Sequence, residues 1–168
     1  GTPVQVADRA TEPLGLPMSP FLLLQLVGPA VALHVTETLH EVFPDRFTVS
    51  ENLRRLVASG RSHFLSWDEQ GRSGLDDQAK GLFEQGGVAR SEQEVRETAL
   101  MALAQEIRLI LDDGVVAEPQ DVDLCLLLGA GWPFHLGGIT PYLDRTGISE
   151  RATGRRFLPL GVASVARP

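Results

Sequence analysis

The feature that most constrains the fold is a long segment of helical periodicity between Ser91 and Gly114. Ser91 and Glu94 have the spacing of a capping box, in which both side chains satisfy free amides at a helix start. Gly114 supplies a left-handed stop. Between them, apolar residues recur at steps of three and four, as on one face of a helix: Val95, Ala99, Ala102, Leu103, Ile107, Ile110 and Leu111. We therefore expect one long amphipathic helix over residues 92–113.

Shorter helices are expected in the first half of the chain. Ser19 and Pro20 have the pattern of an N-cap followed by a first-turn proline, and Gly28-Pro29 must end that helix. A second helix should run from Pro29 to about Phe43, and Ser50 should cap a third. The expected inner face of the second helix is formed by Val31, Val35, Thr38, Leu39 and Val42.

Strand signals are nearly absent. The sequence predicts an all-α fold with at most a small β-ribbon near residues 61–72, where "HFLSWDEQGR" is the only strand-like stretch. A short helix should follow from Asp76 to about Phe83.

The chain also resembles itself. When the first half is aligned with the second at one fixed shift in residue number, prolines, glycines and a valine of expected turns and helices coincide with residues of the same type. The pairs are Pro3 with Pro119, Val6 with Val122, Gly15 with Gly131 and Pro17 with Pro133. With three more residues in the second copy, Leu24, Gln25 and Gly28 coincide with Leu143, Asp144 and Gly147. We expect a duplicated helical domain, with a first repeat over residues 1–88 and a second over 89–168. The first repeat has no counterpart of helix 92–113, so we expect the chain to be part of a longer protein.

The glycine-rich segment "GAGWPFHLGG", residues 129–138, allows two interpretations. A dinucleotide-binding loop needs Gly-x-Gly-x-x-Gly between a strand and a helix. Here Phe134 stands where the third glycine belongs, and the preceding segment has a helical pattern. We therefore expect a corner between packed helices, with Trp132 and Phe134 filling the core.

Composition excludes several functions. The 168 residues carry a formal net charge of −7, which argues against a nucleic-acid binder. The single cysteine, Cys125, excludes a disulfide within the chain and is expected to be a small buried hydrophobic residue. No apolar run reaches the length of a membrane span, and no secretory signal pattern is present, so we expect a cytoplasmic protein.

No catalytic or metal constellation stands out. His34, Glu37 and His40 recur at steps of three on one helix, with Glu41 directly after His40, whereas a helical zinc pair normally uses a step of four. They are interpreted as a solvated face. No Gly-x-Ser-x-Gly motif is present, and the acid pairs lie at expected helix ends. We predict no catalytic and no metal-binding residue.

Two motifs resemble a known family. "GLPMSPFLLLQLVG" is similar to the start of the C-terminal domain of 3-hydroxyacyl-CoA dehydrogenases, usually Gly-x-Pro-Met-Gly-Pro-Phe with a later Asp-x-x-Gly. "DDGVVAEPQDVDLCLLLGAGWPFHLGGITPYLDRTG" resembles the second copy of that domain in multifunctional fatty-acid β-oxidation proteins. Ser19 and Gln25 depart from the usual glycine and aspartate. The chain is thus identified as two tandem copies of this domain.

The resemblance implies a helical fold like the C-terminal domain of 6-phosphogluconate dehydrogenase. The whole protein would be an NAD-dependent 3-hydroxyacyl-CoA dehydrogenase, usually with an enoyl-CoA hydratase domain. Its catalytic His–Glu pair and its NAD would lie in a Rossmann domain outside this chain, so the chain alone should bind no cofactor and be inactive. The family's corner faces the acyl-CoA substrate, which implies substrate contacts for Met18, Pro20 and Phe21. A homo-oligomer, or a complex with a thiolase subunit, is also implied.

Two other functions remain open. The chain could be a helical oligomerisation module without substrate contact, as the long apolar stripe suggests. It could instead be a lipid binder built around "FLLLQLVG".

Overall fold

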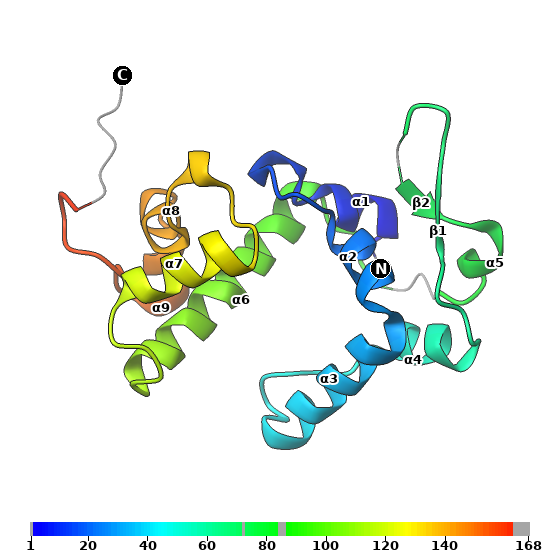
Figure 1. Ribbon diagram of the computed structural model, residues 1–168, viewed down its shortest axis with the longest axis horizontal. Coiled ribbons are helices and arrows are strands. Elements are labelled where there is room, and N and C mark those ends of the chain that lie inside the picture. Colours follow the sequence, from blue (N-terminus) through cyan, green and yellow to red (C-terminus); the bar gives the residue numbers. More distant parts are fainter. Residues whose placement is uncertain (1, 72, 84–86, 163–168) are drawn as a thin grey trace. The chain divides into compact units, whose positions relative to one another are not determined.

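The computed structural model describes residues 2–71, 73–83 and 87–162, and these are mostly helical (Figure 1). The helices in the first half are α1 (Val4–Arg9), α2 (Pro20–Val27), α3 (Pro29–Val42), α4 (Glu51–Ala58) and α5 (Asp77–Lys80). Those in the second half are α6 (Glu92–Asp112), α7 (Pro119–Gly129), α8 (Ile139–Arg145) and α9 (Ile148–Thr153). Short 3-10 turns span Glu12–Leu14 and Phe134–Leu136. The predicted all-α class is confirmed.

The predicted ribbon is also confirmed. Strands β1 (Leu65–Trp67) and β2 (Ser73–Leu75) pair antiparallel, with Leu65 opposite Leu75. Residue 72 of the predicted range lies outside the described residues, as do residues 84–86 and 163–168.

Predicted helix starts agree with the structure because their caps are local. Ser19 Oγ accepts a hydrogen bond from Leu22 N, and Ser50 Oγ accepts one from Leu53 N, each at 3.4 Å. Such caps satisfy amides that the helix itself leaves free. At Gly28 the backbone adopts a positive φ of 98°, and α3 leaves α2 at a bend of 100°.

The chain forms two compact units. The first contains Gly1–Arg9 and Met18–Ser91, and the second contains Ala10–Pro17 and Glu92–Pro168. The core of the first unit is built from buried residues of α4, the ribbon and α5: Leu56, Phe64, Leu65, Leu75 and Ala79. The core of the second unit gathers buried residues of α6 to α9 and their connections: Leu14, Leu100, Ala104, Ile107, Val122, Trp132, Ile139, Leu143, Ile148, Phe157 and Leu158.

The long helix α6 packs against α9 and α8 in the second unit. Its buried residues are Leu100, Ala104 and Ile107, whereas Ala99 and Ala102 of the expected stripe are exposed. The covered face is thus displaced from the predicted stripe, since Leu100 and Ala104 do not belong to that stripe.

Three expectations about buried residues are wrong. Val31, Val35 and Val42 are exposed on α3, because among the described residues α3 packs chiefly against α2 and α4. Cys125 is exposed, since α7 turns Val122 rather than Cys125 into the core. Phe134 is 75% exposed, because Trp132 already fills the core at this corner.

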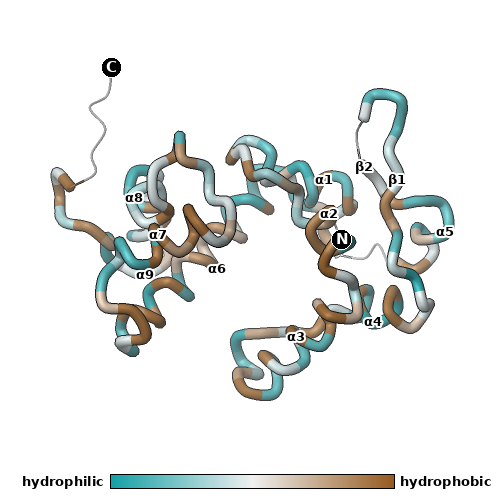
Figure 2. Tube along the Cα trace, viewed as in Figure 1, coloured by the Kyte–Doolittle hydropathy of each residue, from teal (hydrophilic) through white to brown (hydrophobic). Residues whose placement is uncertain are grey.

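Among the described residues, no single helix is long and apolar enough to cross a membrane. Helices α2 and α3 reach that length and hydropathy only as a pair, across the bend at Gly28. Figure 2 shows the hydrophobic stretch that continues from α2 into α3.

Candidate functional site

The residues with predicted substrate contacts lie at the start of α2 in the first unit. Met18 and Pro20 are exposed, and Phe21 is half-buried. Ser19, which replaces the family's usual glycine, is the N-cap of α2. The predicted residues therefore form one short surface turn, and Phe21 alone points into the protein.

A buried carboxylate holds this turn in place. Asp8 on α1 is 2% exposed, and its Oδ1 accepts a hydrogen bond from Phe21 N at 2.9 Å. Its Oδ2 accepts one from Ser73 Oγ at 2.7 Å. A carboxylate near a helix N-terminus is favoured by the free amides and the helix dipole. Asp8 therefore ties α1, the start of α2 and the ribbon together.

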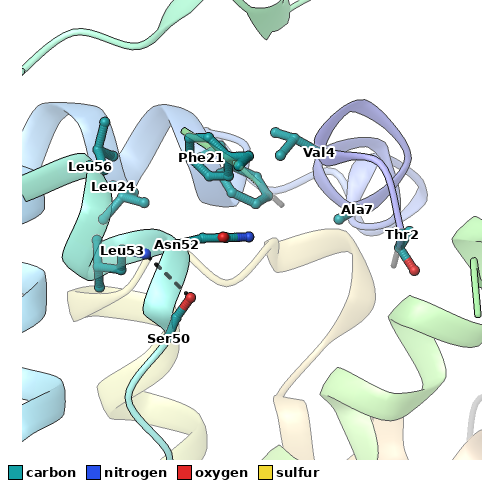
Figure 3. Close-up of a pocket in the computed structure, with 10 residues that line it drawn as sticks. Thr2, Val4, Ala7, Phe21, Leu24, Ser50, Asn52, Leu53 and Leu56 are labelled. Atoms are coloured by element: carbon teal, nitrogen blue, oxygen red, sulfur yellow. Dashed lines mark hydrogen bonds between the residues drawn. The ribbon is translucent and has the colours of Figure 1, made fainter. Parts of the chain in front are cut away.

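Phe21 borders a cavity of about 290 Å³ within the first unit. Figure 3 shows its ring between Val4 and the leucines of α2 and α4. Met18 and Pro20 do not line the cavity. The lining residues come from α1, α2, α4 and the segments beside them: Thr2, Val4, Ala7, Phe21, Leu24, Ser50, Asn52, Leu53, Leu56 and Phe83.

The chemistry of the cavity is that of an apolar binding site. The described residues of its lining are mostly apolar and none of them is titratable, and their polar groups come from Thr2, Ser50 and Asn52. Ser50 Oγ already caps α4. Apolar pockets with a few polar groups are typical of ligand sites. This cavity can therefore bury an apolar chain.

The second unit has a similar arrangement at the start of α8. Asp123 on α7 accepts hydrogen bonds from Thr140 N at 2.7 Å and from Thr140 Oγ1 at 2.8 Å. Thus a carboxylate from the preceding helix binds the second helical residue in α8, as Asp8 does in α2. Desolvation raises the pKa of Asp123 above its ordinary value, although the Thr140 hydrogen bonds act to lower it.

A second pair of similar contacts lies one turn further along. Gln25 Oε1 on α2 accepts hydrogen bonds from Phe64 N and Leu65 N, both at 2.9 Å. Asp144 on α8 accepts hydrogen bonds from Phe157 N and Leu158 N, both at 3.0 Å. Gln25 and Asp144 coincide in the predicted sequence repeat. In each unit, therefore, one helical side chain binds the backbone of a Phe-Leu dipeptide.

The glycine-rich corner at residues 129–138 does not fit a dinucleotide. Helix α7 precedes it, and the two strands described form an antiparallel ribbon elsewhere in the sequence. Trp132 is buried, donates its indole N–H to Gly137 O at 2.8 Å and packs edge-on against Tyr142. Gly131 has a φ of 71°, and a Cβ there would lie 2.9 Å from Pro17 Cγ. The corner is built for close packing.

The histidines of α3 do not gather into a metal site. His34 and Glu41 are exposed, His40 Nδ1 lies 2.6 Å from Phe47 O, and Glu37 pairs with Arg54. Within the described part of the chain, no group of three potential ligands could hold a metal ion.

The sequence analysis did not find Asp8 or most of the cavity lining. Asp8 bonds to a residue thirteen positions away, and the lining joins Val4 to Phe83, so no local spacing reveals either. One signal was available for Asp8: an aspartate lies near the corresponding position of the second copy, at Asp123.

Residues 1–65 match the family model of the "3-hydroxyacyl-CoA dehydrogenase, C-terminal domain". The resemblance inferred from the two motifs is therefore confirmed.

Particular relatives align with nearly the whole chain. The fatty acid oxidation complex subunit alpha of Acinetobacter baylyi is 29% identical over 181 aligned positions, which cover 97% of this chain and 25% of that protein. The subunit of the same name from Psychrobacter sp. is 27% identical, covering 93% of this chain and 24% of that protein. The Shewanella baltica subunit is 27% identical, covering 89% and 22%. The chain thus spans about a quarter of the length of these relatives.

Proposed function

We propose that this chain is the C-terminal, substrate-side part of an NAD-dependent 3-hydroxyacyl-CoA dehydrogenase of fatty-acid β-oxidation. The match of residues 1–65 to the C-terminal domain of that enzyme family is the observation that carries the proposal. The whole enzyme would oxidise a 3-hydroxyacyl-CoA to the 3-ketoacyl-CoA and pass a hydride to NAD held elsewhere. The role of this chain is to bind and orient the acyl part and to exclude water from it.

Within this role, the chain consists of two related helical repeats. The repeated contacts support this: Asp8 and Asp123 each bind the start of the next helix, and Gln25 and Asp144 each bind a Phe-Leu backbone. Gln25 and Asp144 coincide in the sequence repeat although their residue types differ, and Asp123 lies one position from the counterpart of Asp8. Such agreement is expected of duplicated units and not of chance sequence matches.

The substrate wall is the turn from Met18 to Phe21. Phe21 stands at the edge of an apolar cavity, and Met18 and Pro20 expose apolar surface beside it. An acyl chain is flexible and apolar, so its binding depends on the apolar area that it buries. Phe21 is the residue with the largest expected effect.

The test uses the longer protein that contains this chain, assayed for NAD-dependent oxidation of 3-hydroxyacyl-CoA. We expect turnover by that protein and none by the 168-residue chain alone. Phe21→Ala should raise KM several-fold for long acyl chains and leave kcat nearly unchanged, since uniform binding is lost. Leu128→Ala, at an exposed site in the second unit, is the matched control. NAD turnover by the chain alone would contradict the proposal.

The alternative is a helical oligomerisation module without substrate contact. The exposed apolar residues of α3 favour it, because monomeric proteins rarely leave large apolar patches open. A whole protein that assembles and binds acyl-CoA equally well after Met18→Ala and Phe21→Ala would favour this alternative. Both roles are compatible with a partner subunit, such as the thiolase that the family resemblance implies.

A further inference from the structure

A second cavity, of about 230 Å³, lies within the second unit. All of its described lining residues belong to that unit and come from the segment 10–17, from α6, and from α7 with the corner that follows it. The cavity is therefore formed by the second unit alone, whatever the position of the first. The large apolar side chains of its walls are Leu14, Leu16, Leu100, Leu103, Leu126 and Trp132.

One wall of this cavity carries a positive charge. Arg96 on α6 is the one charged side chain among the described lining residues. Its Nη1 donates a hydrogen bond to Ala10 O at 3.0 Å, which holds the guanidinium beside the segment 10–17. A guanidinium has five N–H donors, so most of its donors remain available to a ligand. The neighbouring Glu97 does not neutralise Arg96 by an ion pair, because its carboxylate accepts hydrogen bonds from Gln93 and Arg151.

The cavity and Arg96 together fit an apolar chain that ends in a carboxylate. An apolar cavity of about 150 Å³ can bind a molecule of the size of benzene, which has six carbon atoms. By the same ratio, a cavity of about 230 Å³ holds about nine carbon atoms. A planar guanidinium pairs with a carboxylate through two parallel hydrogen bonds, and such bonds are stronger beside an apolar wall than in water.

We propose that the second unit binds a free medium-chain fatty acid, with its alkyl chain in this cavity and its carboxylate on Arg96. The described lining of the cavity beside Phe21 contains no such charge, so the two cavities favour different ligands. For a ligand of about ten non-hydrogen atoms we expect a Kd on the order of 10–100 µM. This inference does not depend on the proposed enzymatic role.

The first test is a fluorescence titration of the 168-residue chain with octanoate. Trp67 and Trp132 are its two tryptophans, so in a Trp67→Phe background the emission comes from Trp132 in the cavity wall. We expect a saturable change in this emission, and weaker binding of octanoyl-CoA, which has no free carboxylate. Absence of a saturable change, or tighter binding of octanoyl-CoA than of octanoate, overturns the proposal.

The second test separates the charge from the cavity. Arg96→Met removes the charge and keeps an unbranched side chain, so it should weaken octanoate binding at least tenfold and leave the binding of uncharged 1-octanol unchanged. Arg155→Met is the matched control, because Arg155 is an exposed residue of the same unit that pairs with Asp112. Octanoate binding that Arg96→Met does not weaken, or that Arg155→Met weakens equally, overturns the proposal. If Arg96→Met loses 1-octanol as well, the chain-length test decides.

The third test measures the length of alkyl chain that the cavity accepts, with a series of unbranched fatty acids. Each buried methylene should tighten binding roughly fourfold, and the gain should stop at about nine carbon atoms, when the cavity is full. Ala99→Leu, in the α6 wall, should lower this limit by about three carbon atoms, the number that leucine adds to alanine. A gain that continues past this limit, or a limit that Ala99→Leu leaves in place, contradicts binding in this cavity.

Discussion

At the scale of single residues, a few buried or half-buried polar side chains decide how neighbouring elements meet. Asp8, Gln25 and Asp144 each satisfy backbone amides of another segment, at separations of 13 to 40 residues. Buried amides are costly without a partner, so these side chains specify one arrangement of the helices. Their residue types were visible in the sequence, whereas their partners were not.

The raised pKa of Asp123 predicts how the free energy of unfolding depends on pH. Burial raises the pKa of its carboxyl above the ordinary value of 3.8. A group with a raised pKa in the folded state binds its proton more tightly there, so its contribution is fully present below pH 3.8 and is lost as pH rises through the folded pKa. Relative to the Asp123→Asn variant, the free energy of unfolding of the unmodified chain should therefore fall over that range.

Denaturant unfolding at a series of pH values measures this difference. Asp113→Asn, at an exposed position after α6, is the control for the change in net charge. If the free energy of unfolding of the unmodified chain instead rises with pH relative to the Asp123→Asn variant, burial is not the cause of the shift.

At the scale of elements, glycines at the corners between helices serve two purposes. Some adopt a positive φ, and some leave room for another segment to approach closely. Gly131 combines a positive φ with a close approach to Pro17. Gly147, which coincides with Gly28 in the repeat, has a positive φ of 70° and open space around it. Gly138 has an ordinary φ, but a Cβ there would collide with the Asp123 carboxylate.

Substitution of these glycines by alanine distinguishes the cost of a positive φ from the cost of a steric collision. Gly147→Ala should lower the free energy of unfolding by about 1–2 kcal/mol, which is the cost of a left-handed L-residue. Gly131→Ala should cost more, since Pro17 must also move. Gly138→Ala should displace Asp123 and loosen the start of α8. Equal losses at Gly131 and Gly147 in thermal and denaturant unfolding would show that the Pro17 contact is unimportant.

At the scale of the whole molecule, the chain contains two cores instead of one. Phe64 and Leu143 are fully buried, the first in one core and the second in the other. Residues 10–17 belong to the second unit although the chain on either side of them belongs to the first. A division of the chain at a single point therefore does not describe its packing.

The two cores should respond separately when one buried side chain is replaced by alanine. Phe64→Ala should cost about 3–5 kcal/mol and Leu143→Ala about 2–5 kcal/mol. Amide hydrogen exchange should accelerate in α2 to α5 for the first variant and in α6 to α9 for the second. Their effects should add in the double variant. Equal acceleration in both units by either variant would mean that the chain unfolds as one cooperative body.

The sequence by itself determined the helices and their caps, because these depend on contacts within a few positions, and it showed the family resemblance through short motifs. Ser19, Ser50 and Asp76 cap helices whose first turns they adjoin, and the family motifs are short corners of glycine and proline. Only the tertiary structure decided which apolar faces are covered. The valines of α3 and Phe134 have the residue types of a core, but whether such a side chain is buried depends on which distant element packs over it. The cavity beside Phe21 was likewise decided only by the tertiary structure, since its walls come from α1, α2 and α4 and no single segment contains it.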